Sequence, residues 1–269
     1  MKYKLFISDY DGTLGKAPKN NIDSETLRAI NEFIKKGGIF AVCSGRETSS
    51  ITRILKENDL KGLVVSFQGA RITDIESGEV LLDGGLDVEA AVNLIKDLEQ
   101  FNLTPLVYSG NSFFYRESTP YVEVYERAVR IHGRIEPDMI KAVCDANIRT
   151  SKICWLGDDK LVSEVADKMN VKYAGTGVKF NSGAECLLEG INAKYNKGAA
   201  VKYLAKYYDI PLNEIIVVGD STNDIDLLVG EWHGVCVGDG REELKAVADE
   251  VTVPFDQKPV KTLLEKYCL

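Results

Sequence analysis

The chain has 269 residues, of which 45% are apolar and 28% are charged, with a formal net charge of −8. This length and apolar content suffice for one large domain or two modest ones. The negative charge argues against a broad nucleic-acid surface, which needs clustered Lys and Arg, but a local positive pocket for a phosphorylated substrate remains compatible with it.

Strand and helix patterns alternate in the first third of the chain. A helix that Asp23 or Ser24 can cap ends at Gly37, and a second helix runs to about Asn58. Around them lie short apolar runs predicted as buried strands, at residues 4–8, 39–43 and 63–66. Strands and helices in this order predict right-handed crossovers and a parallel sheet.

The last third of the chain repeats this rhythm. Residues 197–208 and 242–248 are predicted as helices, and residues 215–218 and 234–237 as strands. An acidic turn at residues 220–226 follows the first of these strands and leads into a short helix. This segment therefore belongs to the same α/β pattern as the first third.

The middle of the chain, from about residue 83 to 191, has an α+β pattern. We predict helices at 88–101 and 161–169 and strands at 104–108, 112–115, 152–155 and 172–173. The predicted fold class is therefore α/β, with a Rossmann-like parallel-sheet core interrupted by an inserted α+β domain. We expect residues 1–83 and 191–269 to form the core and residues 84–190 to form the insertion.

Membrane and disulfide classes are not expected. No apolar run approaches the roughly 20 residues that cross a bilayer, and the N-terminal segment lacks the features of a secretory signal. The six cysteines are scattered without a CxxC pair, which is typical of buried thiols in a reducing compartment. We expect a cytoplasmic protein that binds neither membrane nor nucleic acid.

Polar residues that carry chemistry follow the predicted strands of both α/β segments. The first group is Asp9-Tyr10-Asp11-Gly12-Thr13, directly after the first strand. An isolated Asp-Gly would be an ordinary turn, but the whole string after a buried strand favours two carboxylates that face one crevice. Ligands of open parallel sheets bind beyond the carboxyl ends of the strands, where distant loops converge.

Three further groups have weaker signals, and each has a structural alternative. Ser44-Gly45-Arg46 offers a hydroxyl and backbone N–H groups to an anion, or caps a helix. Lys197, at the start of a helix, is a site residue or a solvated surface lysine. The run 219–224, with Asp220, Asn223 and Asp224, is a site or a capped turn.

Together these groups predict a metal-assisted phosphoryl site. Four carboxylates would converge, and like charges at about 4 Å repel by roughly 4 kcal/mol per pair at an effective dielectric near 20. They need a compensating cation, and oxygen ligands without His or Cys favour Mg²⁺. Lys197 and Ser44 would bind the phosphoryl oxygens. The acids concerned are Asp9, Asp11, Asp220 and Asp224.

The order and content of these segments resemble the haloacid dehalogenase superfamily, and within it the Cof-type hydrolases, whose large cap lies between the second and third motifs (a type IIB-like arrangement). The resemblance implies that Asp9 attacks phosphorus and becomes an aspartyl phosphate. It implies that Asp11 protonates the leaving oxygen and then activates water. An Asp rather than a Thr at position 11 favours rapid turnover over a long-lived phosphoenzyme.

The same resemblance implies the remaining roles. Mg²⁺ would be bound by the carboxylates of Asp9 and Asp220 and the backbone carbonyl of Asp11, with Asp224 supporting the metal site or Lys197. The residues expected to bind phosphate are Ser44, Gly45, Lys197 and Asn223. Arg46 either contacts substrate or forms a structural salt bridge. Gln68 departs from the family, which usually has Asn before Gly-Ala at this point.

The predicted function is hydrolysis of a small phosphorylated metabolite, with a sugar phosphate as the first guess. The inserted domain would act as a cap, and its candidate contacts are Asn111, Phe113, Tyr115, Arg116 and the segment Lys179-Phe180-Asn181, although each also fits a surface turn or the cap core. A phosphomutase and a non-enzymatic phospho-acceptor module remain alternatives. We expect a monomer or a homodimer.

Overall fold

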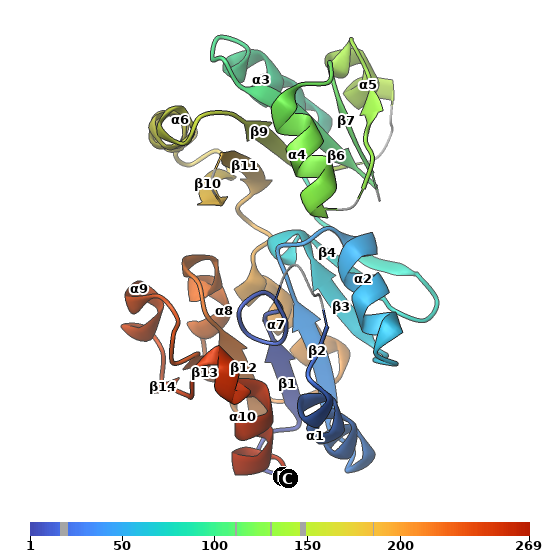
Figure 1. Ribbon diagram of the computed structural model, residues 1–269, viewed down its shortest axis with the longest axis vertical. Helices are drawn as coiled ribbons and strands as arrows, with labels where there is room; N and C mark the ends of the chain where they lie inside the picture. Colours follow the sequence, from blue (N-terminus) through green and yellow to red (C-terminus); the bar gives the residue numbers. More distant parts are fainter. Residues whose placement is uncertain (17–20, 111, 130, 146–148, 185) are drawn as a thin grey trace. The chain divides into compact units, whose positions relative to one another are not determined.

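The chain forms two compact units in the computed structural model (Figure 1), which describes residues 1–16, 21–110, 112–129, 131–145, 149–184 and 186–269. One unit combines Met1–Leu82 with Asn196–Leu269, and the other is the continuous segment Asp83–Tyr195. The first unit is therefore built from both ends of the chain.

An eight-stranded sheet forms the centre of the first unit, in the order β14-β13-β12-β1-β2-β3-β4-β5. The pairs from β14 to β3 are parallel, and β4 runs antiparallel to β3. Leu5 of β1 pairs with Ile215 of β12, so distant parts of the sequence meet at the middle of the sheet. The strands are β1 (Leu5–Ser8), β2 (Ile39–Cys43), β3 (Leu63–Ser66), β4 (Arg71–Asp74), β5 (Val80–Asp83), β12 (Ile215–Gly219), β13 (His233–Cys236) and β14 (Glu250–Val251).

Helices cover both faces of this sheet, which explains why its central strands are apolar without alternation. Phe6 packs in one cluster with residues of α1, α2 and α10, whereas its neighbours Leu5 and Ile7 pack in another with residues of α7, α8 and α9. The helices are α1 (Ser24–Lys35), α2 (Thr48–Glu57), α7 (Lys197–Tyr207), α8 (Ile225–Leu228), α9 (Glu242–Lys245) and α10 (Pro259–Tyr267), with 3₁₀ turns η1 (Phe67–Gly69), η2 (Leu212–Glu214), η3 (Thr222–Asp224) and η4 (Phe255–Gln257).

The second unit has a six-stranded sheet in the order β10-β11-β9-β6-β7-β8, which is antiparallel except for the β7–β8 pair. Trp155 and Phe180 lie in its main apolar cluster, together with residues of α3, α5 and α6. Its elements are α3 (Val88–Leu98), β6 (Thr104–Ser109), β7 (Ser112–Tyr115), α4 (Pro120–Val129), β8 (Arg134–Ile135), α5 (Met139–Asp145), β9 (Thr150–Leu156), α6 (Asp159–Lys172), β10 (Val178–Ala184) and β11 (Leu187–Asn192).

The predicted strand at residues 172–173 is wrong. Lys172 is the last residue of α6, and the N–H of Tyr173 closes that helix on the carbonyl of Met169 at 2.8 Å. A basic residue in a last helical turn interacts favourably with the helix dipole. None of the helices in the described ranges combines the length and apolar character needed to cross a membrane.

Candidate active site

The predicted site residues follow four neighbouring strands of the core sheet. Asp9 follows β1, Ser44 follows β2, Gln68 lies in η1 after β3, and Asp220 follows β12. These strands are adjacent and parallel in the order β12-β1-β2-β3. Their carboxyl ends therefore reach one edge of the sheet, as the crossover pattern predicts.

Lys197 is a buried residue at the centre of this edge. Its side chain is 1% exposed, and its Nζ donates to Oδ1 of Asp9 and to Oδ1 of Asp224, both at 2.5 Å. Asn196 caps α7 by accepting the backbone N–H of Ala199 at 2.8 Å, and this cap fixes where Lys197 begins the helix. The surface-lysine alternative is therefore wrong.

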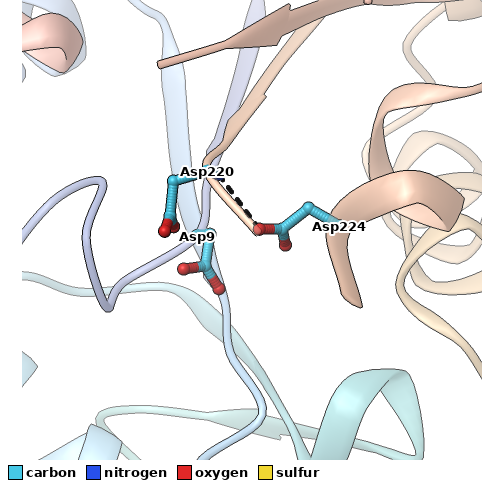
Figure 2. Close-up of side chains that lie close together, drawn as sticks. All are labelled: Asp9, Asp220 and Asp224. Atoms are coloured by element: carbon cyan, nitrogen blue, oxygen red, sulfur yellow. Dashed lines mark hydrogen bonds between the residues drawn. The ribbon is translucent and has the colours of Figure 1, made fainter. Parts of the chain in front are cut away.

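Three carboxylates lie close together at this edge of the sheet (Figure 2). Ligand oxygens of Asp9, Asp220 and Asp224 all lie within 4.8 Å of one another. Oδ2 of Asp224 accepts the backbone N–H groups of Asp220 and Ser221, each at 3.1 Å, so the turn is capped and also contributes to the cluster. The capped-turn alternative is thus correct, and the role of Asp220 and Asp224 in a site stays a prediction.

The electrostatics of the cluster favour an additional cation. Burial, and next the Asp224 carboxylate, raise the pKa of Asp9 well above its usual range, although Lys197 opposes the shift. Burial and Asp224 also raise the pKa of Asp220 to about 6. Burial disfavours a charged Lys197, but Asp224 and Asp9 outweigh it and raise the pKa of that lysine. The single positive charge of Lys197 is thus set against three neighbouring carboxyl groups.

The donor chemistry of this cluster fits a hard divalent ion. Its ligand atoms are all carboxylate oxygens. Oxygen donors suit Mg²⁺, Ca²⁺ and Mn²⁺, whereas softer metals prefer imidazole or thiolate ligands. A bound dication would also offset the negative charge that raises the pKa values of Asp9 and Asp220.

Asp11, the fourth acid predicted for the cluster, is not among the three described acids that group together. Its two carboxylate oxygens accept bonds from Nη2 and Nε of Arg46, at 2.6 and 2.7 Å. The guanidinium also lies over the Tyr10 ring, 4.8 Å from its centroid. The side chain of Asp11 is 47% exposed and that of Arg46 is 18% exposed, so this pair is more exposed than Lys197 and Asp224.

Ser44 and Asn223 lie on loops at the same edge. The helix-cap alternative for Ser44 is wrong, because Glu47 is the N-cap of α2 and accepts the N–H of Ser49 at 2.7 Å. The Ser44 Oγ instead accepts the backbone N–H of Arg46 at 3.1 Å. Nδ2 of Asn223 donates to Oε1 of Gln68 at 3.2 Å.

Sequence reasoning gave no role to Thr13, whose Oγ1 donates to Oδ1 of Asp220 at 3.0 Å. Gly12 is needed beside it, since its φ is +82° and a Cβ there would lie 2.5 Å from Oδ2 of Asp220. Thr13 and Gly12 belong to the same five-residue segment as Asp9, so the segment already marked them as candidates. The segment could not show that Thr13 bonds Asp220, which lies more than 200 positions away.

The candidate contacts of the second unit have mixed outcomes. Asn111 lies outside the described residues. Phe113 and Phe180 are 1% and 3% exposed within the unit, so for them the interior alternative is correct. Tyr115 is also buried, and its hydroxyl donates to Glu126 at 3.2 Å. Arg116 forms a half-exposed ion pair with Glu99.

Comparisons with known proteins find hydrolases and phosphatases of similar sequence and fold. Residues 6–264 match the family model of the haloacid dehalogenase-like hydrolases. The chain is 26% identical to Phosphatase YwpJ of Bacillus subtilis, over 97% of this chain and 99% of that protein. It is 25% identical to the HMP-PP phosphatase of Yersinia enterocolitica, over 93% and 89% of the two chains. A solved haloacid dehalogenase-like hydrolase from Bacteroides thetaiotaomicron shares the fold with a TM-score of 0.84, at 24% identity over 98% and 99%. The predicted fold class is confirmed.

Proposed function

The chain belongs to the haloacid dehalogenase-like hydrolases and is a phosphatase of the Cof type. From this premise we propose that it hydrolyses a small phosphorylated metabolite. The reaction would use Mg²⁺ and pass through an aspartyl phosphate on Asp9. The observation that carries the proposal is the buried Lys197, bonded to both Asp9 and Asp224 beside Asp220. A buried ammonium group can bind a dianionic phosphate once a divalent cation offsets the charge of the surrounding carboxylates.

The first chemical step belongs to Asp9. One of its carboxylate oxygens attacks phosphorus, the bond from phosphorus to the leaving oxygen breaks, and a mixed anhydride forms on Asp9. Lys197 already contacts Oδ1 of Asp9, so it orients this carboxylate and can contact the phosphoryl oxygens as they arrive. Ser44, Gly45 and Asn223 are proposed as further phosphate contacts at the same edge.

Asp11 is proposed to move the protons. In its acid form it protonates the leaving oxygen, and as a carboxylate it then takes a proton from water, whose oxygen attacks phosphorus and releases inorganic phosphate and the Asp9 carboxylate. Both Asp11 oxygens bond Arg46, so Asp11 has to leave this guanidinium to carry a proton. An anionic or hydroxylated substrate group that binds Arg46 would free Asp11, which favours a substrate contact for Arg46.

The metal site and the domain roles complete the proposal. Mg²⁺ bound by Asp9, Asp220 and the Asp11 backbone carbonyl, with Asp224 in support, would offset charge on the phosphoryl group as a Lewis acid. We propose that the first unit, predicted as residues 1–83 and 191–269, is the catalytic core and that the second unit, predicted as residues 84–190, is the substrate cap. A sugar phosphate remains the first substrate to test. A cytoplasmic location and a monomeric or homodimeric state stay predictions.

Phosphate release tests the proposal directly. Purified protein with Mg²⁺ should release inorganic phosphate from p-nitrophenyl phosphate, chelation with EDTA should abolish release, and added Mg²⁺ should restore it. A panel of sugar phosphates, together with HMP-PP because of the relative named above, then narrows the substrate. Asp9→Asn keeps the size of the side chain and removes the nucleophile, so it should lose activity by at least about 10³-fold.

Two results would contradict the proposal. The first is full activity in Asp9→Asn, and the second is no phosphate release across the whole panel. An isomeric sugar phosphate formed without free phosphate would instead indicate a phosphomutase. A phosphoprotein that persists after incubation with acetyl phosphate would indicate a phospho-acceptor module.

A further inference from the structure

The η1 turn after β3 contacts two other segments at the edge of the sheet that carries the site. The N–H of Phe67 donates to the carbonyl of Arg46 at 2.9 Å, and the N–H of Gln68 donates to the carbonyl of Ser44 at 3.1 Å. A Cβ on Gly69 would lie 2.2 Å from the carbonyl oxygen of Asn196, directly before Lys197. The turn therefore lies against both residues 44–46 after β2, which are predicted to bind phosphate, and the start of α7.

The backbone of this turn is strained. Phe67 and Gln68 are consecutive non-glycine residues with φ of +50° and +58°, in the left-handed region that side chains with a Cβ avoid. Such strain persists only where surrounding contacts hold it, and it concentrates at functional sites. Here the hydrogen bonds to Arg46 and Ser44 hold the strained residues in place.

This backbone directs the Gln68 side chain into the site. Its amide lies so close to Gly45 that a Cβ on Gly45 would come within 2.3 Å of Nε2. Its Oε1 accepts the N–H of Asn223, which comes from the loop after β12. The amide thus spans from the predicted phosphate loop to a predicted phosphate ligand that lies 155 positions later.

We propose that Gln68 is a positioning residue of the phosphatase site, which holds the amide of Asn223 in the direction that contacts the phosphoryl group. This inference rests on the proposed function, since it assigns Asn223 to phosphate. With one N–H of Asn223 held by Gln68, the second N–H and Oδ1 have fixed directions. The strained turn and the missing side chain at Gly45 are the features that allow Gln68 to reach it.

A double-mutant cycle tests this coupling. Gln68→Met keeps the length of the side chain and removes its acceptor, so kcat/KM should fall about two- to tenfold, the effect of one neutral hydrogen bond. Asn223→Ala should lower kcat/KM by at least the same factor. The double variant should match Asn223→Ala within about twofold, because Gln68 acts through Asn223. If the double variant instead shows the product of the two single-variant losses in kcat/KM, the proposal is overturned.

Two further substitutions at position 68 separate positioning from a structural role. Gln68→Gly relieves the left-handed strain, so it should raise Tm by about 2 °C while lowering kcat/KM as much as Gln68→Met does. Gln68→Glu keeps an acceptor for Asn223 but adds a negative charge, so it should raise the Ki of inorganic phosphate more than Gln68→Met. Activity that follows Tm across the variants would overturn the proposal.

The outcome also separates this proposal from the proposed function. If the wild-type protein turns over no substrate, the proposed function fails, and the same cycle is run on the Kd of inorganic phosphate with Mg²⁺ by calorimetry. Coupled losses of phosphate affinity at Gln68 and Asn223 would still support the positioning role. Independent losses, or no phosphate binding by the wild type, would overturn it.

Discussion

Replacing the buried Lys197 by Met should destabilise the protein strongly. The substitution leaves Asp9 and Asp224 without their shared partner, and these two residues are 5% and 0% exposed. Each contact of 2.5 Å corresponds to about 7 kcal/mol of Coulomb attraction at an effective dielectric near 20. Desolvation offsets most of this attraction, and loss of one partner from such a group costs about 3–5 kcal/mol.

Urea unfolding of the metal-free protein at pH 7.5 measures this cost. The matched control is Lys202→Met, which removes an exposed lysine from the same helix and should change the unfolding free energy by less than about 0.5 kcal/mol. Adding Asp224→Asn to Lys197→Met removes one unpaired charge but keeps an oxygen for the N–H groups of Asp220 and Ser221. The double variant should recover about 1–2 kcal/mol.

The pH dependence of the Lys197→Met defect gives a second check. Burial already raises the pKa of Asp9 in the wild type, and loss of Lys197 raises it further. The folded variant then binds more protons than its unfolded chain does. The loss of unfolding free energy caused by Lys197→Met should therefore shrink as the pH falls from 7.5 to 5.5. A Lys197→Met protein within about 1 kcal/mol of the wild type at pH 7.5 would refute the reasoning, as would a defect that grows on acidification.

Three other predictions concern the metal and the acids. Because the pKa of Asp220 is raised to about 6, protons should compete with Mg²⁺ below that pH. The Kd of Mg²⁺, measured by calorimetry, should then rise by up to about tenfold per pH unit. A Kd that stays constant from pH 7 to 5 would contradict this. Gly12→Ala and Gly78→Ala both place Ala at positive φ, at +82° and +76°, but only Gly12 faces Asp220. Both should lose about 1 kcal/mol of stability, and only Gly12→Ala should weaken Mg²⁺ binding; equal Mg²⁺ affinities would count against the predicted metal site. Asp11→Asn should slow turnover by about 10²–10⁴-fold while the Kd of Mg²⁺ stays within about twofold, since the Asp11 carboxylate pairs with Arg46 instead; a large loss of Mg²⁺ affinity would show that this carboxylate moves to the metal.

The parts of the fold that follow from local pattern were predictable. The strands that contain Phe6, Val42 and Val217 are unbroken apolar runs, because both faces of the core sheet are covered. The polar residues that follow them had to meet at one edge, since parallel strands share a direction. The sequence therefore predicts that Asp9 and Asp220 lie close together, as the structure has them.

Other features depend on tertiary contacts that leave little local trace. Helix α4 was not predicted, and Val122 is its one buried residue, so its apolar periodicity is weak. Nothing near Lys197 distinguishes it from a surface lysine, because its burial comes from Asp9 and Asp224 on other segments. The bidentate pairing of Arg46 with Asp11 likewise needs two loops to approach each other.

The pairing of β1 with β12 has a consequence for how the protein is made. Asp9 leaves the ribosome well before β12, the strand that flanks β1 on one side and begins at Ile215. Until that strand is synthesised, β1 has an open apolar edge of the kind that recruits other chains. The continuous segment Asp83–Tyr195 has no such dependence and can form its own core meanwhile. The acid cluster around Asp9 is therefore completed only when the segment from Asn196 onward closes the sheet, so a chain that stops before this segment carries Asp9 without Lys197, Asp220 and Asp224.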